Sequence, residues 1–203
     1  MTQRLFIQFA LPAVALVAMV LPAHATTVDY STTGVITCAG CTGSGTSTVT
    51  FGPLTMTYLP IASSSVGANP TTNASAGEIK ITDTSTANTL INGTFALTIN
   101  QTVPSVGSGH LDSGTFSGSL ASNGSSAMLS FTASTLNLGG IEYTLDGFAF
   151  GTSYILVPPN TNNGITSLEM SVTSTLPEPT FVALTAFGFV GMGVVAFRRR
   201  RRA

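Results

Sequence analysis

The stretch TFALTIN, residues 94–100, carries the clearest periodic pattern of the chain. Phe95, Leu97 and Ile99 fall on one side of an extended backbone, and Thr94, Ala96, Thr98 and Asn100 fall on the other. Successive side chains of a β-strand point to opposite faces, so strict alternation predicts a strand with one buried and one solvated face. We therefore expect a strand over residues 94–100.

The same alternation recurs on both sides of this stretch. It predicts roughly nine short strands, separated by turns rich in Gly, Pro, Asn and Ser. The phase changes at Gly52-Pro53, which predicts a bend or bulge, and at Gly139-Gly140, which predicts a bulge or a tight turn. Residues 63–76 and 103–114 are interpreted as loops. Because no long helical period and no repeat of fixed length occur, the pattern favours an all-β fold, a single antiparallel β-sandwich or jelly-roll-like domain, over a β-solenoid.

The first residues resemble an export signal. Arg4 precedes an apolar run over residues 5–21, and Ala23-His24-Ala25 follows with the small residues of an A-x-A cleavage site. This pattern predicts a Sec signal peptide over 1–25, with an exported domain over 26–175. An uncleaved N-terminal anchor is the alternative.

The last residues combine three features in a fixed order. Pro177-Glu178-Pro179 is followed by an apolar run over 180–197 and then by a basic cluster, Arg198, Arg199, Arg200, Arg201 and Arg202. An apolar helix of about 18 residues spans roughly 27 Å, enough for a bilayer core, and it has no polar face that would suit a soluble core helix. The arginines predict a stop-transfer signal that stays in the cytoplasm.

This ordered triple resembles the PEP-CTERM sorting signal of bacterial surface proteins, and the resemblance is confined to residues 176–203. It implies transient retention in the inner membrane, followed by recognition and cleavage at Pro177-Glu178-Pro179 by an exosortase. The processed domain would then reach the cell envelope surface or the extracellular space, commonly in Gram-negative bacteria that make exopolysaccharide. The resemblance predicts where the protein is delivered, but it predicts no activity for residues 26–175.

The expected exported domain is acidic, although the whole chain has a formal net charge of only −1. The domain contains one Lys or Arg residue, Lys80, and seven acidic residues, which gives a net charge near −6. These acids are Asp29, Glu78, Asp83, Asp112, Glu142, Asp146 and Glu169. Such a domain lacks the cations that bind phosphate backbones, which argues against nucleic acid as a partner. It also lacks the basic patch that binds anionic lipid.

Cys38 and Cys41 are the only cysteines. A Cys-x-x-Cys pair at a helix N-terminus can be a redox site, but the following Thr-Gly-Ser-Gly (42–45) does not favour a helix. A zinc site would need further thiols or histidines. In an exported chain the pair predicts a small disulfide.

Catalytic signals are weak. His110 is the only histidine of residues 26–175, Asp112 is too near in sequence for a typical triad, and no G-x-S-x-G motif occurs. Asp83, Asp112 and Asp146 fall at the ends of expected strands, where carboxylates can bind Ca²⁺, but no D-x-D-x-D spacing supports such a site. We therefore predict no catalytic residue, no cofactor and no metal.

The leading interpretation is a non-enzymatic cell-surface or matrix protein associated with exopolysaccharide or biofilm. A carbohydrate-binding, lectin-like domain is the alternative, and a secreted polysaccharide hydrolase is a weaker one because tryptophan and a nucleophile motif are absent. Four N-x-S/T sequons, at Asn73, Asn92, Asn100 and Asn123, are candidate glycan acceptors.

Overall fold

The alternating stretch 94–100 lies within strand β6 (Thr89–Val103). Phe95, Leu97 and Ile99 are buried, whereas the side chains between them are exposed or half-buried. The predicted strand and its buried face are therefore confirmed. β6 is longer than the pattern predicts because Ile91 and Gln101, both buried, continue its inward face at the two ends.

The structure is a computed structural model that describes residues 26–68, 71–83, 86–132, 135–146 and 153–175. Contacts gather Thr26–Thr175 into one unit. The first of its two antiparallel sheets runs in the order β12 (Ser153–Ile155), β9 (Met128–Ser130), β7 (Gly107–Ala121), β6, β1 (Thr26–Thr37) and β4 (Ser64–Ala68), and β8 (Gly124–Ser125) also pairs with β7. The second runs β10 (Thr135–Leu138), β11 (Ile141–Leu145), β13 (Ile165–Ser174), β5 (Thr71–Asp83), β3 (Leu54–Leu59) and β2 (Thr48–Phe51). A short 3₁₀ turn, η1 (Asn162–Gly164), precedes β13.

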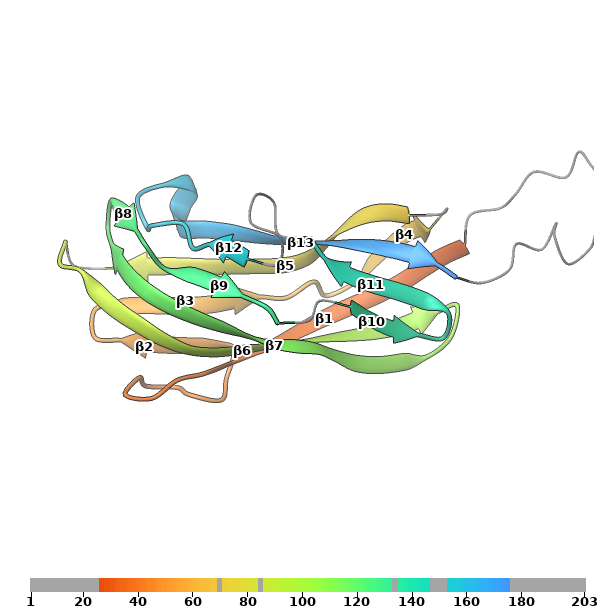
Figure 1. Cartoon of the computed structure of the whole chain (residues 1–203), viewed down its shortest axis with the longest axis horizontal. Coiled ribbons are helices and arrows are strands. Elements are labelled where there is room, and N and C mark those ends of the chain that lie inside the picture. Colours follow the sequence, from red (N-terminus) through yellow and green to blue (C-terminus); the bar gives the residue numbers. More distant parts are fainter. Residues whose placement is uncertain (1–25, 69–70, 84–85, 133–134, 147–152, 176–203) are drawn as a thin grey trace, which may run out of the picture. The chain divides into compact units, whose positions relative to one another are not determined.

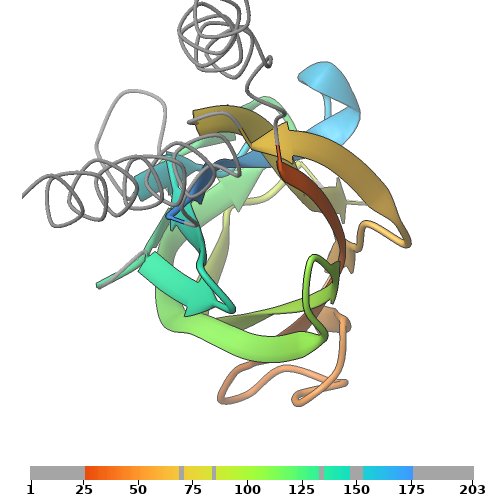
Figure 2. The ribbon, with the colours of Figure 1, turned by 90° about the vertical axis from the view of Figure 1, so that its right-hand side faces the viewer.

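The two sheets curl around a shared interior (Figures 1 and 2). Inward-facing side chains from both sheets form one apolar cluster, which includes Phe95 and Leu97 from the first sheet and Met56 and Ile81 from the second. This arrangement confirms the all-β class and is consistent with a β-sandwich, in which the inner faces of two sheets make the core.

Both predicted phase changes are hairpin turns. Phe51 pairs with Leu54 across Gly52-Pro53, so this dipeptide reverses the chain and is not the bend or bulge expected from the sequence. Gly52 has a φ of 59°, which matches a type II′ turn with glycine first. Leu138 pairs with Ile141 across Gly139-Gly140, and both glycines have positive φ, which matches a type I′ turn.

Two predicted loops are wrong. Residues 63–76 contain β4 and the first half of β5, and residues 103–114 contain half of β7. In the second case the inward face carries Leu111 and several glycines. At Gly109 the side chain of Leu136 of β10 fills the space, since a Cβ there would lie 2.7 Å from Leu136 Cδ1. In the first case Ser, Thr and Ala replace large apolar residues. The prediction of roughly nine short strands is also wrong, since thirteen strands are described and three of them have 13 to 15 residues.

The four tyrosines of the chain join the two sheets. Tyr30 of β1 donates to the Ser75 carbonyl of β5 at 2.8 Å. Tyr143 of β11 donates to Gln101 Oε1 of β6 at 2.7 Å. Tyr154 of β12 donates to the Glu169 carbonyl of β13 at 2.9 Å. Burial raises the pKa of each of these phenols. Because each hydroxyl is buried and bonded, the tyrosines fix how the sheets face each other.

The fourth tyrosine, Tyr58 of β3, occupies a buried polar cluster. Its hydroxyl lies 2.7 Å from both the Thr32 hydroxyl of β1 and the Ala76 carbonyl of β5. A carbonyl only accepts, so the phenol proton goes to Ala76, and Thr32 donates to the phenol oxygen while accepting the Ile61 N–H at 2.9 Å. Gly77 makes room for this contact, since a Cβ there would lie 2.6 Å from the Tyr58 oxygen.

Candidate functional site: a neutral face and an open groove

The Cys38 and Cys41 sulfurs are joined in a disulfide, with the Cα atoms 5.9 Å apart. The bridge lies in the loop between β1 and β2, where the Cys38 N–H donates to Ser44 Oγ at 3.0 Å. Isolated bridges from Ile36 to Thr46 and from Thr42 to Thr50 hold this loop against both strands. The disulfide thus fixes the place where β1 stops and the chain turns away.

The candidate catalytic and calcium-binding residues do not form a common site. His110 lies on β7 and not in a loop, is exposed, and places Nδ1 2.7 Å from Thr98 Oγ1. Asp112 is also inside β7, whereas Asp83 ends β5 and Asp146 follows β11. Among the described residues, no group of three or more His, Cys, Asp or Glu side chains is placed to hold a metal ion.

The sorting motif Pro177-Glu178-Pro179, the apolar run 180–197, the arginines 198–202 and the signal peptide 1–25 lie outside the described residues. Of the residues that are described, none forms a helix long and apolar enough to cross a bilayer.

The outward face of the first sheet carries a row of hydroxyl side chains. Thr37 pairs with Thr94, Thr94 with Thr115, Thr115 with Ser130, and Ser130 with Ser153. These five residues sit on five adjacent strands, and Ser153 Oγ donates to Ser130 Oγ at 2.9 Å. At about 4.8 Å between strands, the row spans roughly 19 Å of surface without a charged side chain.

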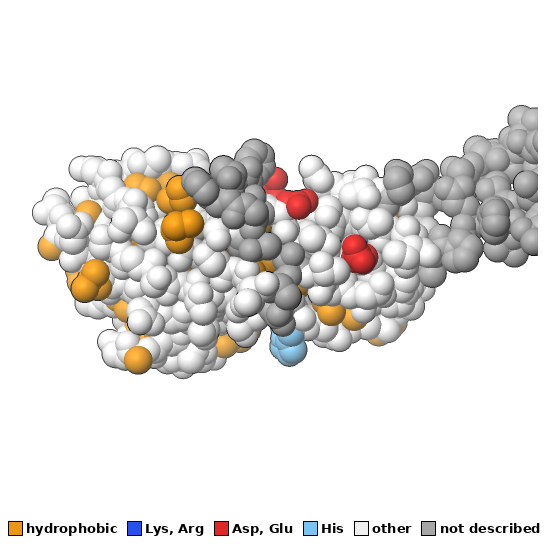
Figure 3. Space-filling model, in the orientation of Figure 1, with side chains coloured by type: hydrophobic (Ala, Val, Ile, Leu, Met, Phe, Trp, Pro, Cys, Tyr) orange, Lys and Arg blue, Asp and Glu red, His pale blue; other side chains and the backbone are white. Residues whose placement is uncertain are grey.

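Two further rows run parallel to the first. Thr98 lies between Thr33 and His110, and Asn100 lies between Ser31 and Ser108, whose Oγ donates to Asn100 Oδ1 at 2.7 Å. One face of the molecule, shown in Figure 3, is mostly white, with scattered hydrophobic and acidic side chains and no visible Lys or Arg. Hydroxyl and amide groups therefore dominate the polar surface of this sheet.

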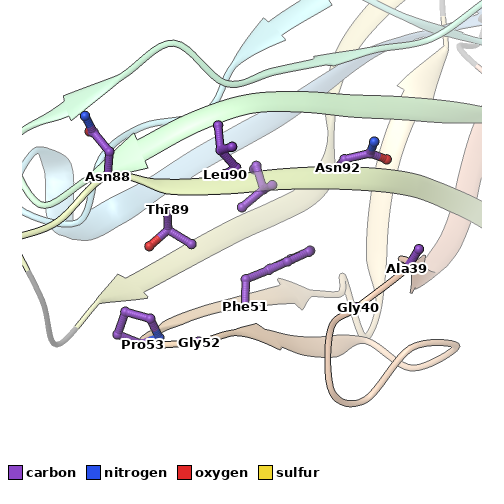
Figure 4. Close-up of a pocket in the computed structure, with 10 residues that line it drawn as sticks. Ala39, Gly40, Phe51, Gly52, Pro53, Asn88, Thr89, Leu90 and Asn92 are labelled. Carbon is purple, nitrogen blue, oxygen red and sulfur yellow. The ribbon is translucent and has the colours of Figure 1, made fainter.

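An open groove of about 410 Å³ lies where β1 ends (Figure 4). Three segments line it: the disulfide loop, the β2–β3 turn and the start of β6. The lining residues are Ala39, Gly40, Phe51, Gly52, Pro53, Asn88, Thr89, Leu90, Ile91 and Asn92. None of these ten residues is charged. The volume falls in the range typical of ligand sites.

The groove has an apolar floor and an apolar rim. Phe51 is almost fully buried and packs edge-on against Phe116, with ring centroids 6.1 Å apart. Leu90 is 81% exposed, although it lies on β6, an interior strand of the first sheet. Neither Phe51 nor Leu90 is predicted as a site residue from the sequence. The one available signal is Leu90 itself, an apolar residue in the outward phase of β6, and that signal is lost when the strand is taken to begin at Thr94.

Comparison with protein-family models, with curated proteins and with solved structures finds no match for this chain.

Proposed function

We propose that the chain is an exported, non-enzymatic matrix protein of the bacterial cell surface that associates with neutral exopolysaccharide. Its N-terminal pattern supports Sec export, and its last 28 residues support exosortase-dependent sorting from the inner membrane. The jelly-roll form of the sandwich and the C-terminal membrane helix belong to the same proposal.

The hydroxyl row from Thr37 to Ser153 is the observation that carries the role of the domain. A polysaccharide presents hydroxyls, and a hydroxyl face exchanges hydrogen bonds with it without desolvating a charge. Each such bond contributes only about 0.5–1.5 kcal/mol net, because water competes for the same groups. Repetition along a polymer makes the total useful, since many weak contacts add through multivalency. Weak, repeated contact suits a protein that is embedded in a hydrated matrix.

A charge placed in the row tests this role. The Thr94→Glu variant should lose at least half of its co-sedimentation with neutral exopolysaccharide, because a carboxylate within the row keeps its own hydration water. Thr57→Glu, on the outward face of the second sheet, is the matched control and should bind like wild type. Equal loss in both variants would show that the row has no special part in binding.

Replacing Pro177, Glu178 and Pro179 by alanine tests sorting. In an exosortase-bearing host with a tag after Thr26, we expect the variant to be exported but kept at full length in the inner membrane. Fractionation and immunoblotting read out length and compartment together. Processing and localisation like wild type would contradict exosortase recognition and leave residues 180–197 as a plain membrane anchor.

A further inference from the structure

The start of β6 has an edge that no described strand covers. The ladder between β1 and β6 runs to the pair Thr37 and Thr94 and stops there, because β1 ends and the disulfide loop begins. Residues 89–93 of β6 pair with β7 alone. The other side of this segment faces the groove (Figure 4).

Backbone direction on this edge follows from two independent contacts. The Ile36 N–H donates to the Thr46 carbonyl, and the Ile36 carbonyl accepts from the Gly45 N–H, so both backbone groups of Ile36 point away from β6. The N–H and C=O of the next residue, Thr37, therefore point toward β6. The N–H and C=O of Thr94, which lies opposite Thr37, therefore point toward β1. Counting back by twos along β6, Asn92 and Leu90 point their N–H and C=O groups to the same side, into the groove.

The opposite side of β6 gives the same answer. Ser119 is the register partner of Leu90, and its carbonyl accepts the Ser126 N–H at 2.9 Å, on the side away from β6. Leu90 and Ser119 are therefore a non-hydrogen-bonded pair. The Leu90 N–H and C=O point away from β7, which confirms their direction into the groove.

We propose that this groove binds an extended, uncharged peptide segment. The peptide pairs antiparallel with the edge of β6, at the position in the sheet that β1 would occupy if it continued past Thr37. An open strand edge is a template for another strand, and addition of a peptide strand to a sheet edge is a known recognition mode. We expect antiparallel pairing because β1, which pairs with the same edge of β6, is itself antiparallel to β6.

The walls of the groove select this occupant. None of the ten lining residues is charged, so a charged peptide would lose water without gaining a partner. Gly40 and the Gly52-Pro53 turn lie across the groove from β6 (Figure 4). Side chains that face inward would meet Phe51 and Ile91, so the peptide should alternate apolar and polar residues.

The probe is a fluorescent peptide, Thr-Val-Thr-Val-Thr with blocked ends, measured by fluorescence polarisation on the full-length chain in mild detergent. In an antiparallel ladder, residues directly opposite each other share a face, so the threonines lie opposite Leu90 and Asn92 and donate to them. N-methylation of the threonines should weaken binding at least about tenfold, since two or more hydrogen bonds are lost. N-methylation of the valines, whose N–H groups point away from β6, should leave binding within about threefold. Equal effects of the two methylations, or no binding of the parent peptide, would overturn the proposal.

A protein variant tests the same edge from the other side. Leu90→Pro removes an N–H that points into the groove and leaves the β7 ladder intact, so the variant should fold but not bind the peptide. Leu90→Ala also lacks the leucine side chain but keeps the N–H, so it should still bind the peptide where Leu90→Pro does not. Circular dichroism checks the fold of both variants, and the methylated peptides decide the question on wild type if the proline variant does not fold. Displacement of the peptide by a neutral hexasaccharide that binds wild type and Leu90→Pro equally would assign the groove to a glycan and overturn the peptide proposal.

Discussion

Replacing Tyr58 by phenylalanine tests how the sheets are held together. The register between β5 and β13 steps from Gly77 to Ser75 and leaves Ala76 in a bulge, and the ladder between β3 and β5 ends at Glu78. The Ala76 carbonyl is thus outside both neighbouring ladders, and the Tyr58 hydroxyl, 2.7 Å away, satisfies it. In the phenylalanine variant this buried carbonyl loses that donor, while the ring that packs on Phe95 remains.

The expected loss follows from the cost of an unsatisfied buried group. Leaving a buried acceptor without a donor costs about 1–3 kcal/mol, and we expect the free energy of unfolding to fall by that amount. For a unit of this size the melting temperature should fall by roughly 2–4 °C for each kcal/mol. Urea unfolding of the 26–175 unit, which contains the whole described core, measures the change. Thr57→Val is the matched control, because its 3.2 Å bond to Thr48 is exposed and should be worth less than about 0.5 kcal/mol.

Alkaline pH gives a second readout of the same group. Burial raises the pKa of Tyr58 to about 12, above its ordinary value of about 10. The folded state therefore keeps this proton in a range where the unfolded state has lost it, so the stabilisation is complete below pH 10 and is lost as the pH rises toward 12. Wild type should lose stability more steeply across this window than Tyr58→Phe. Parallel curves, together with a loss below about 0.5 kcal/mol at neutral pH, would refute the assigned role of the Tyr58 hydroxyl.

Two further predictions concern the loop and the core. If the chain is exported as proposed, Cys38 and Cys41 should form a disulfide. Mass spectrometry of the non-reduced, alkylated protein should therefore find neither cysteine alkylated, and two alkylated cysteines would contradict the pairing. Gly34→Ala should destabilise the fold by about 1–3 kcal/mol, because its Cβ would lie 2.5 Å from Tyr58 Cδ1 and 2.6 Å from Phe95 Cε2. Gly124→Ala, with open space around it, is the control and should unfold like wild type.

Local periodicity was enough to predict the all-β class. The predicted strand over 94–100 is present, and the same alternation of buried and less buried residues around Ile81 and Met170 lies within β5 and β13, because a period of two is set by adjacent residues. The proposed sorting segment is equally local, since its three sequence features follow one another along the chain. These features needed no knowledge of the fold.

Long-range packing decided the rest. Gly109 reads as a loop residue, yet it belongs to a long strand because Leu136, 27 positions later, fills the space in front of it. The Ala76 bulge holds because a phenol from another strand reaches its carbonyl. The groove exists because β1 stops at Thr37, whereas β6 extends beyond Thr94, the residue that pairs with Thr37. These two residues are 57 positions apart in the sequence. A single sequence encodes which face of a strand is apolar, but partners and edges depend on residues that only the folded chain brings together.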